Sequence, residues 1–379
     1  MKRLNQLNMQ FAAPASSDSG PAKLIVDGKT YTELIDHQPS RVIKQDYFNK
    51  QGWGFSDSGF TYLKESNSVK IKGTRYMYGN QVLPNLLPFF EKALKIDARY
   101  SDFPQADIQV PPPMLNHAFL EELGEKDFSR RSFEKWERIM HSHGATLEEI
   151  NAIRYTTLKR YADVVVYPNS TEHCEKLVKL AMKHNVCLVP YGGGTNVTKA
   201  LQLPTTEKRM IVSVDMQRMN AVKWVDKENR TACIQAGVMG TELERSLKAF
   251  GVVLGHEPDS HEFSTLGGWI STRASGMKKN TYGNIEDIVV NITIVTPKGT
   301  YQKNALWPRI SNGPDLNHLI MGSEGNFGII TEAVLRVRPI PEAKIYDSIL
   351  FYDFEQGIKF MYEVSSLRQY PTSLRLIDN

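Results

Sequence analysis

Residues 186–196 read VCLVPYGGGTN, a short apolar run followed at once by three glycines. The apolar run predicts a strand. Because glycine has no Cβ and adopts positive φ at little cost, the loop Gly192-Gly193-Gly194 lets backbone N–H groups approach an anion closely. The spacing matches neither the Rossmann fingerprint nor the P-loop. The stretch predicts a pyrophosphate cradle, and a mobile glycine-rich loop is the alternative that stays open at this point.

Strand and helix signals alternate on both sides of this loop. Strands are predicted at residues 163–167, 210–214, 231–236, 288–295 and 328–337, with a hairpin turn at 296–300. Apolar residues at 174, 177, 178 and 181 share one face of a predicted helix. Thr241 and Glu244 predict a capping box at the start of another helix, which ends at Gly251. Mixed elements of this kind predict an α+β or α/β domain over about residues 155–340.

The first part of the chain is less regular. Residues 23–157 are predicted to form an N-terminal extension, helical in part, with helix-compatible spacing at 82–95. Thr146 and Glu149 match a capping box. His141 and His143 fall on different faces of a helix at this spacing, so they make a poor metal pair and are expected to be solvated.

The composition of the chain argues against several classes of function. The 379 residues predict two or three domains, and 46 basic against 42 acidic side chains give a net charge of only +4. This balance does not call for nucleic acid as a partner. The three cysteines form no CxxC pair, and no metal site is expected. No apolar run approaches the roughly 18 residues that span a bilayer.

The first residues of the chain resemble a targeting signal. Residues 3–11, from Arg3 to Phe11, resemble a type-2 peroxisomal targeting nonapeptide, and residues 12–22 are small, polar and typical of a linker. The segment 1–22 is therefore interpreted as targeting and linker sequence, and the expected location is the peroxisome. A start that matches by accident is the alternative.

Three more glycine- and serine-rich stretches lie beside predicted elements. They read GHEPDSHEFSTLGG (255–268), STRASG (271–276) and GSEGNFG (322–328). Each alone is an ordinary turn. Together with residues 190–196 they suit a large, extended ligand that is held by backbone contacts along its length.

In this order and spacing, the four stretches resemble the FAD-binding domain of the vanillyl-alcohol-oxidase type flavoproteins. Within that superfamily, the stretches HEPDS (256–260) and TRASGMKKN (272–280) are similar to the alkyldihydroxyacetonephosphate synthase family. The resemblance implies an α+β fold: a two-lobed FAD-binding domain of the vanillyl-alcohol-oxidase (PCMH) type over 158–340. It also implies an N-terminal helical extension and the start of a cap domain over 341–379.

The resemblance also implies a set of cofactor contacts. The implied FAD-binding residues are Pro190, Tyr191, Gly192, Gly193, Gly194, Thr195, Asn196, Asp259, Ser260, His261, Glu262, Phe263, Ser264, Thr265, Thr272, Arg273, Ala274, Ser275, Glu324, Gly325, Asn326, Phe327, Gly328, Ile329 and Ile330. Some relatives carry in the glycine-rich loop a histidine that bonds to the flavin. Here that loop holds only glycines, so FAD is expected to bind non-covalently.

The implied reaction exchanges the acyl group of an acyl-dihydroxyacetone phosphate for a long-chain fatty alcohol, in ether lipid biosynthesis. It needs a general base, a phosphate-binding cation and an apolar channel. Arg375 matches a family arginine tied to activity, and a guanidinium suits phosphate; a surface arginine without such a role is the alternative. His256 and Glu257 lie close to the flavin loops and could titrate usefully or serve as structural hydrogen-bonders. Peripheral membrane contact and a homodimer are also expected.

Two other hypotheses remain open from the sequence. One is a flavin oxidase or dehydrogenase of 2-hydroxy acids on the same fold. The other is a catalytically silent, C-terminally truncated form, since the resemblance implies that relatives continue into a region with a tyrosine and a histidine cluster. The start of the cap is expected at residues 345–352, followed by a helix over 355–367. Without its partner strands, this start is expected to expose Leu350, Phe351 and Met361.

Overall fold

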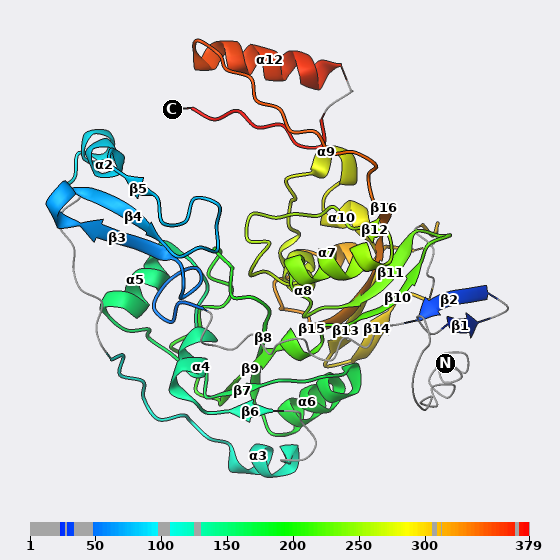
Figure 1. Ribbon diagram of the computed structural model, residues 1–379. Helices are drawn as coiled ribbons and strands as arrows, with labels where there is room; N and C mark the ends of the chain where they lie inside the picture. The colour runs from blue at the N-terminus through cyan, green and yellow to red at the C-terminus, as the bar shows by residue number, and fades with distance from the viewer. Residues whose placement is uncertain are drawn as a thin grey trace, which may run out of the picture. The chain divides into compact units, whose positions relative to one another are not determined.

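The computed structural model describes residues 48–97, 107–124, 130–304, 309–311, 313–367 and 371–378, together with the backbone of two strands near the N-terminus (Figure 1). The proposed targeting segment, residues 3–11, lies outside the described residues. The chain forms two compact units, and each combines separate parts of the sequence. The first comprises residues 1–39, 167–182 and 215–379, and the second comprises 40–166 and 183–214.

An antiparallel seven-stranded sheet organises the first unit. Its strands, in spatial order, are β1 (Lys23–Val26), β2 (Lys29–Glu33), β10 (Val222–Asp226), β11 (Thr231–Gln235), β15 (Ile329–Arg336), β13 (Val289–Thr296) and β14 (Gly299–Gln302). β13 and β14 form the predicted hairpin, with Thr296 opposite Gly299. The central strands β13 and β15 are buried over most of their length, which agrees with their runs of β-branched residues.

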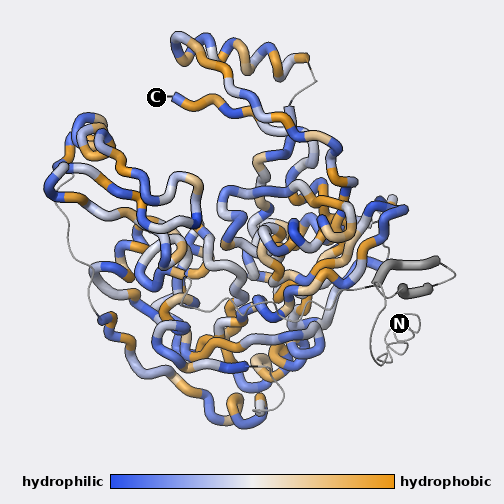
Figure 2. The backbone as a smooth tube through the Cα atoms, in the orientation of Figure 1, coloured by the Kyte–Doolittle hydropathy of each residue, from blue (hydrophilic) through white to orange (hydrophobic). Residues whose placement is uncertain are grey.

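Helices and short elements complete the first unit. They are α6 (Thr171–Lys183), α7 (Gly240–Ala249), α8 (Leu266–Thr272), α9 (Lys279–Tyr282), α10 (Ile285–Ile288), α11 (Asn317–Ile320), α12 (Phe354–Ser366), the 3-10 turn η3 (Met216–Arg218) and the strand pair β12 (Val252–Val253) with β16 (Arg338–Pro339). Leu247 of α7 and Trp269 of α8 pack with Ile234, Ile292 and Leu335 of the sheet. Each such burial contributes roughly 1.5–3 kcal/mol. Figure 2 shows apolar residues along these strands.

The second unit contains two smaller sheets. The four-stranded sheet has the order β6 (Arg131–Ser132), β7 (Val164–Val166), β9 (Ile211–Asp215) and β8 (Cys187–Tyr191), and the other sheet has the order β3 (Gly59–Leu63), β4 (Ser68–Lys72) and β5 (Val82–Leu83). The remaining elements are the 3-10 turn η2 (Lys64–Ser66) and the helices α2 (Leu86–Leu94), α3 (His117–Leu123), α4 (Lys135–Met140) and α5 (Leu147–Tyr155). β6 belongs to the predicted extension and yet pairs with β7, so the extension is strand as well as helix.

Asp163 connects three segments of the second unit. The carboxylate is fully buried. It accepts hydrogen bonds from the backbone N–H groups of Met114 (2.8 Å) and Ile211 (2.7 Å). It also accepts two from the guanidinium of Arg160, at 3.0 and 2.6 Å. The side chain thereby fixes the start of β9 against β7, next to the strand that leads into the glycine-rich loop.

The capping predictions have opposite outcomes. Thr146 and Glu149 form the predicted capping box at the start of α5. The capping box predicted at Thr241 is wrong, because α7 begins at Gly240 with Met239 as its N-cap and no side-chain cap. The carboxylate of Glu244 instead accepts a hydrogen bond from the backbone N–H of Gly255, at 2.9 Å. A tertiary contact has replaced the local one.

The segment after β16 differs in part from its prediction. The helix expected over 355–367 is present as α12. Leu350 is exposed as expected, whereas Phe351 and Met361 are half-buried. The ring of Phe351 packs on that of Phe360, with centroids 5.4 Å apart. None of the helices in the described part of the chain has the length and apolar character that a membrane span requires.

Candidate functional site: the glycine-rich loops

The glycine-rich loop follows β8 as predicted, although Pro190 and Tyr191 of the stretch 190–196 form the end of that strand. Gly194 has φ +68°, and a Cβ on it would lie 2.2 Å from the hydroxyl oxygen of Tyr191. Only glycine allows the backbone to turn this closely over the tyrosine. The ring of Tyr191 in turn packs on the imidazole of His141, with centroids 4.2 Å apart. The loop is therefore built for close approach of its backbone, which is what a pyrophosphate cradle requires.

The turn between α4 and α5 supports this loop. The backbone N–H of Ala145 donates to the carbonyl of Asn196 at 2.7 Å. The backbone of Gly144 approaches so closely that a Cβ there would lie 2.4 Å from the same carbonyl oxygen. Buried Glu149 holds the turn, because its carboxylate accepts hydrogen bonds from the N–H groups of Gly144 (2.9 Å) and Thr146 (3.1 Å). The capping box of α5 thus also positions the glycine-rich loop.

The expectation that the two histidines of this turn are solvated is wrong. His141 is only 3% exposed, beneath Tyr191. Burial lowers the pKa of His143, which keeps its imidazole neutral at pH 7. Helical spacing could not reveal this, because the packing partner is a residue 50 positions away.

Gly144→Ala is expected to raise the dissociation constant of FAD at least tenfold. The new methyl group would collide with the carbonyl of Asn196, so either the turn or the glycine-rich loop must shift. Fluorescence titration of the flavin-free protein with FAD measures the effect. Gly59→Ala is the matched control in the same unit, because a Cβ there meets no atom within 4 Å. Equal FAD affinities for the two variants would contradict the supporting role of the turn.

The stretch 259–265 lies in the first unit as a turn that leads into α8. It is attached to the segment before α7, where the N–H of Gly240 donates to the carbonyl of Ser264 (3.2 Å) and that of Leu266 donates to Val238 (3.0 Å). Trp269 donates its indole N–H to the hydroxyl of Ser264 at 2.7 Å. Thr265 caps α8 by accepting from the N–H of Gly268. These bonds fix the backbone of the predicted FAD-binding turn.

The structure brings two other predicted stretches together. The N–H of Glu324 donates to the carbonyl of Ser271 (2.9 Å), and the N–H of Gly322 donates to that of Ile270 (3.1 Å). The turn at 322–328 therefore lies against the end of α8, beside Thr272 to Ser275. Gly328 has φ +157°, and a Cβ there would lie 2.2 Å from the carbonyl oxygen of Val295. The glycine is needed where the turn enters β15.

His256 is buried behind these loops. The side chain is fully inaccessible, and neither ring nitrogen finds a hydrogen-bond partner among the described residues. Its ring packs against Trp269 at 5.1 Å between centroids, and His261 stacks on the same indole at 5.9 Å. Burial, with a smaller contribution from His261, lowers the pKa of His256 to about 4. Glu257, by contrast, forms an ion pair with Lys278.

The predicted catalytic residue Arg375 lies beside one of the FAD loops. Its guanidinium is 3.7 Å from the carboxylate of Asp259 and contacts the sulfur of Met277. Hydrogen bonds from Asn280 to the carbonyl of Pro371 and between Thr281 and Thr372 attach the preceding segment to the same part of the unit. The guanidinium is about half exposed, which leaves it accessible to an anionic substrate.

Both the fold and the loops fit FAD. Gly194 and Gly328 occupy places where a Cβ would collide with neighbouring atoms, so the loops can approach a large ligand through their backbone. A family model described as a FAD binding domain matches residues 162–304. The residues that this model matches therefore form a FAD-binding domain. The individual contacts and the non-covalent attachment stay predictions.

Comparison with known proteins identifies the nearer relatives. The chain is 43% identical over 349 residues to alkyldihydroxyacetonephosphate synthase of Caenorhabditis elegans, covering 92% of this chain and 58% of that protein. A solved structure of an alkyldihydroxyacetonephosphate synthase matches with a TM-score of 0.76 and 36% identity, over 86% of this chain and 61% of that one. The chain is thus homologous to the alkyldihydroxyacetonephosphate synthases across the span it shares with them, which is about three-fifths of their length.

A hydroxy-acid flavoenzyme is a weaker match. Mitochondrial D-lactate dehydrogenase (cytochrome) of Arabidopsis thaliana is 35% identical over 184 residues, which is 48% of this chain and 31% of that protein. This alignment covers about half as much of the chain as the alignment with the Caenorhabditis elegans protein.

Sequence reasoning missed the residues that support the loops. Gly144 and Glu149 belong to the site because they hold Asn196, although Glu149 was recognised only as a helix cap. A lone glycine between helices carries no signal of a contact 52 positions away.

Proposed function

We propose that this chain catalyses FAD-dependent alkylglycerone-phosphate synthesis, in which a long-chain fatty alcohol replaces the acyl group of an acyl-dihydroxyacetone phosphate. The homology to alkyldihydroxyacetonephosphate synthases supports the reaction class. In the structure, the guanidinium of Arg375 lies 3.7 Å from the carboxylate of Asp259, in a predicted FAD-binding stretch, and this observation supports the proposal because a guanidinium suits phosphate.

Different residues have different roles in the proposed reaction. Residues 190–196, 259–265, 272–275 and 324–330 would hold FAD. When bound, FAD supplies the reactive ring system for an exchange that involves no net oxidation. Arg375 binds and orients the phosphate of the substrate. His256 does not serve as the general base, because its imidazole is fully buried and its pKa near 4 makes it a weak proton acceptor at neutral pH.

Arg375→Ala is expected to lower the rate of ether formation at least tenfold, with a smaller loss for Arg375→Lys, which keeps the charge but not the bidentate geometry. The assay measures incorporation of radiolabelled hexadecanol by the FAD-loaded protein supplied with palmitoyl-dihydroxyacetone phosphate. Arg309→Ala, which removes an exposed arginine elsewhere, serves as the control. Unchanged FAD absorbance in all variants separates loss of the reaction from loss of the cofactor.

The hydroxy-acid alternative has its own readout. D-Lactate and glycolate are added anaerobically, and the flavin absorbance near 450 nm is followed. Bleaching by either acid, together with no transfer of the alcohol, would replace the proposed function with oxidation of 2-hydroxy acids. Alcohol transfer without bleaching supports the proposal.

We also propose a peroxisomal location and peripheral contact with a membrane, as the targeting-like segment at Arg3 and the lipid substrates suggest. A homodimer is part of the same proposal. Fluorescence microscopy of the tagged chain with Arg3→Ala, co-sedimentation with vesicles and light scattering test the three parts separately.

A further inference from the structure

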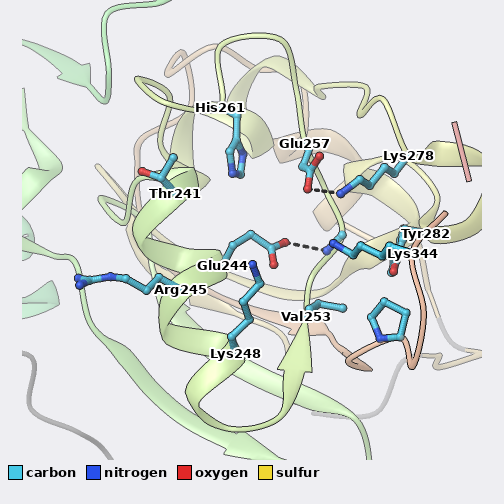
Figure 3. A pocket seen from close by; sticks show the side chains of 12 residues that line it. Thr241, Glu244, Arg245, Lys248, Val253, Glu257, His261, Lys278, Tyr282 and Lys344 are labelled. Atoms are coloured by element: carbon cyan, nitrogen blue, oxygen red, sulfur yellow. Dashed lines mark hydrogen bonds and ion pairs between the residues drawn. The ribbon is translucent and has the colours of Figure 1, made fainter. Parts of the chain in front are cut away.

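A cavity of about 290 Å³ opens in the first unit, between α7 and the segments that carry Gly255, Lys278 and Lys344 (Figure 3). Basic side chains dominate the charged part of its wall, with Arg245, Lys248, Lys278 and Lys344 against Glu244 and Glu257. Most ligand pockets are largely apolar, with only a few polar groups. A small cavity with this many charges is suited to a small ionic ligand instead.

Both acidic side chains are already engaged. Glu244 accepts the hydrogen bond from the N–H of Gly255, and Glu257 is paired with Lys278. Arg245 pairs with Glu242, outside the cavity wall. Across the described residues, Lys248 and Lys344 have no carboxylate within ion-pair distance. In Figure 3 their amino groups point toward the middle of the cavity. Glu244 keeps its negative charge, because a backbone N–H does not neutralise a carboxylate, so the lining holds four cations against two carboxylates.

Neutral hydrogen-bond donors surround the same space. Thr241 contributes a hydroxyl from the first turn of α7, and Tyr282 contributes one from the end of α9. The ring of Tyr282 is fixed from both sides: a Cβ on Gly255 would lie 2.2 Å from it, and the guanidinium of Arg338 lies 5.3 Å from its centre. His261 also lines the cavity, and its Nδ1 is buried with no partner among the described residues.

We propose that this cavity binds a phosphate group, either as inorganic phosphate or as a phosphomonoester of a small alcohol. The excess of cations over carboxylates in the lining suits the negative charge of phosphate near neutral pH, and the hydroxyls supply further donors to its oxygens. Like charges that face one cavity repel each other, and an anion between them removes that repulsion. The proposal is independent of the ether-forming reaction, because binding is measured without turnover.

Isothermal titration calorimetry of the FAD-saturated protein with inorganic phosphate tests the proposal. Saturating FAD occupies the sites for the cofactor's own phosphates. The double variant Lys248→Gln/Lys344→Gln is expected to raise the dissociation constant of phosphate at least tenfold. Both lysines are exposed, so the substitutions leave the fold intact. Lys227→Gln/Lys298→Gln, which removes two exposed lysines from hairpin turns of the same unit, is expected to bind phosphate like the wild type.

Two further measurements complete the test. Affinity that falls as NaCl rises from 20 to 300 mM supports a charge-dominated site. Tighter binding of glycerol 3-phosphate than of inorganic phosphate identifies the ester as the ligand, and equal binding identifies the free anion. Failure of the wild type to bind either compound saturably, or equal affinity in the two double variants, overturns the proposal.

Discussion

Asp163→Ala is expected to lower the free energy of unfolding by about 3–5 kcal/mol, because it removes one partner of a buried ion pair. The substitution leaves the guanidinium of Arg160, whose side chain is only 12% exposed, without its carboxylate. It also leaves the backbone N–H groups of Met114 and Ile211 without their acceptor. Urea unfolding followed by circular dichroism at pH 7 measures the change.

Two variants make this expectation specific. Asp163→Asn keeps the shape of the side chain and one carbonyl acceptor. Its free energy of unfolding is therefore expected to lie between those of Asp163→Ala and the wild type. Asp107→Ala removes an exposed carboxylate that pairs with Lys135, and it is expected to cost less than about 1 kcal/mol. Similar losses for Asp163→Ala and Asp107→Ala would show that the buried network does not anchor β9. Because β8 pairs with β9, loss of this anchor also weakens the base of the glycine-rich loop.

Lowering the pH from 7 to 5 is expected to reduce the free energy of unfolding by about 2 kcal/mol through His256 alone, since each pKa unit corresponds to 1.36 kcal/mol. Burial lowers the pKa of His256 from 6.5 to about 4 in the folded protein. Between these values the unfolded chain takes up a proton that the folded chain does not, so stability falls as the pH falls. The full contribution is lost only below pH 4.

His256→Asn is expected to reduce this pH dependence, measured as the free energy of unfolding at pH 7, 6 and 5. Part of the slope remains, because burial also lowers the pKa of His143 and of His261. His318→Asn, which changes an exposed histidine in the same unit, is expected to keep the full slope. A slope unaffected by His256→Asn would show that the imidazole gains a partner in solution.

The strands and helices around the glycine-rich loops were predictable because their signals are local. The apolar spacing at Cys174 and Leu177 produced α6, and the β-branched run before Gly299 produced β13. The order of the four glycine- and serine-rich stretches predicted the cofactor, which the FAD binding domain match confirmed. Such patterns can be read from the sequence because a backbone that approaches a ligand closely requires glycine at fixed positions.

Only the tertiary structure decided which distant residues complete these elements. It turned Glu244 from an expected helix cap into an acceptor for Gly255, and it buried His141 beneath Tyr191. It also placed Gly144 against Asn196 and collected the four cations of the cavity from three segments. Sequence patterns encode interactions along a helix or a strand, whereas burial and charge pairing depend on which segments meet. The sequence by itself therefore determined the cofactor class and predicted the loops that would hold it, and packing between segments decided the burial of the histidines and which charged side chains line the cavity.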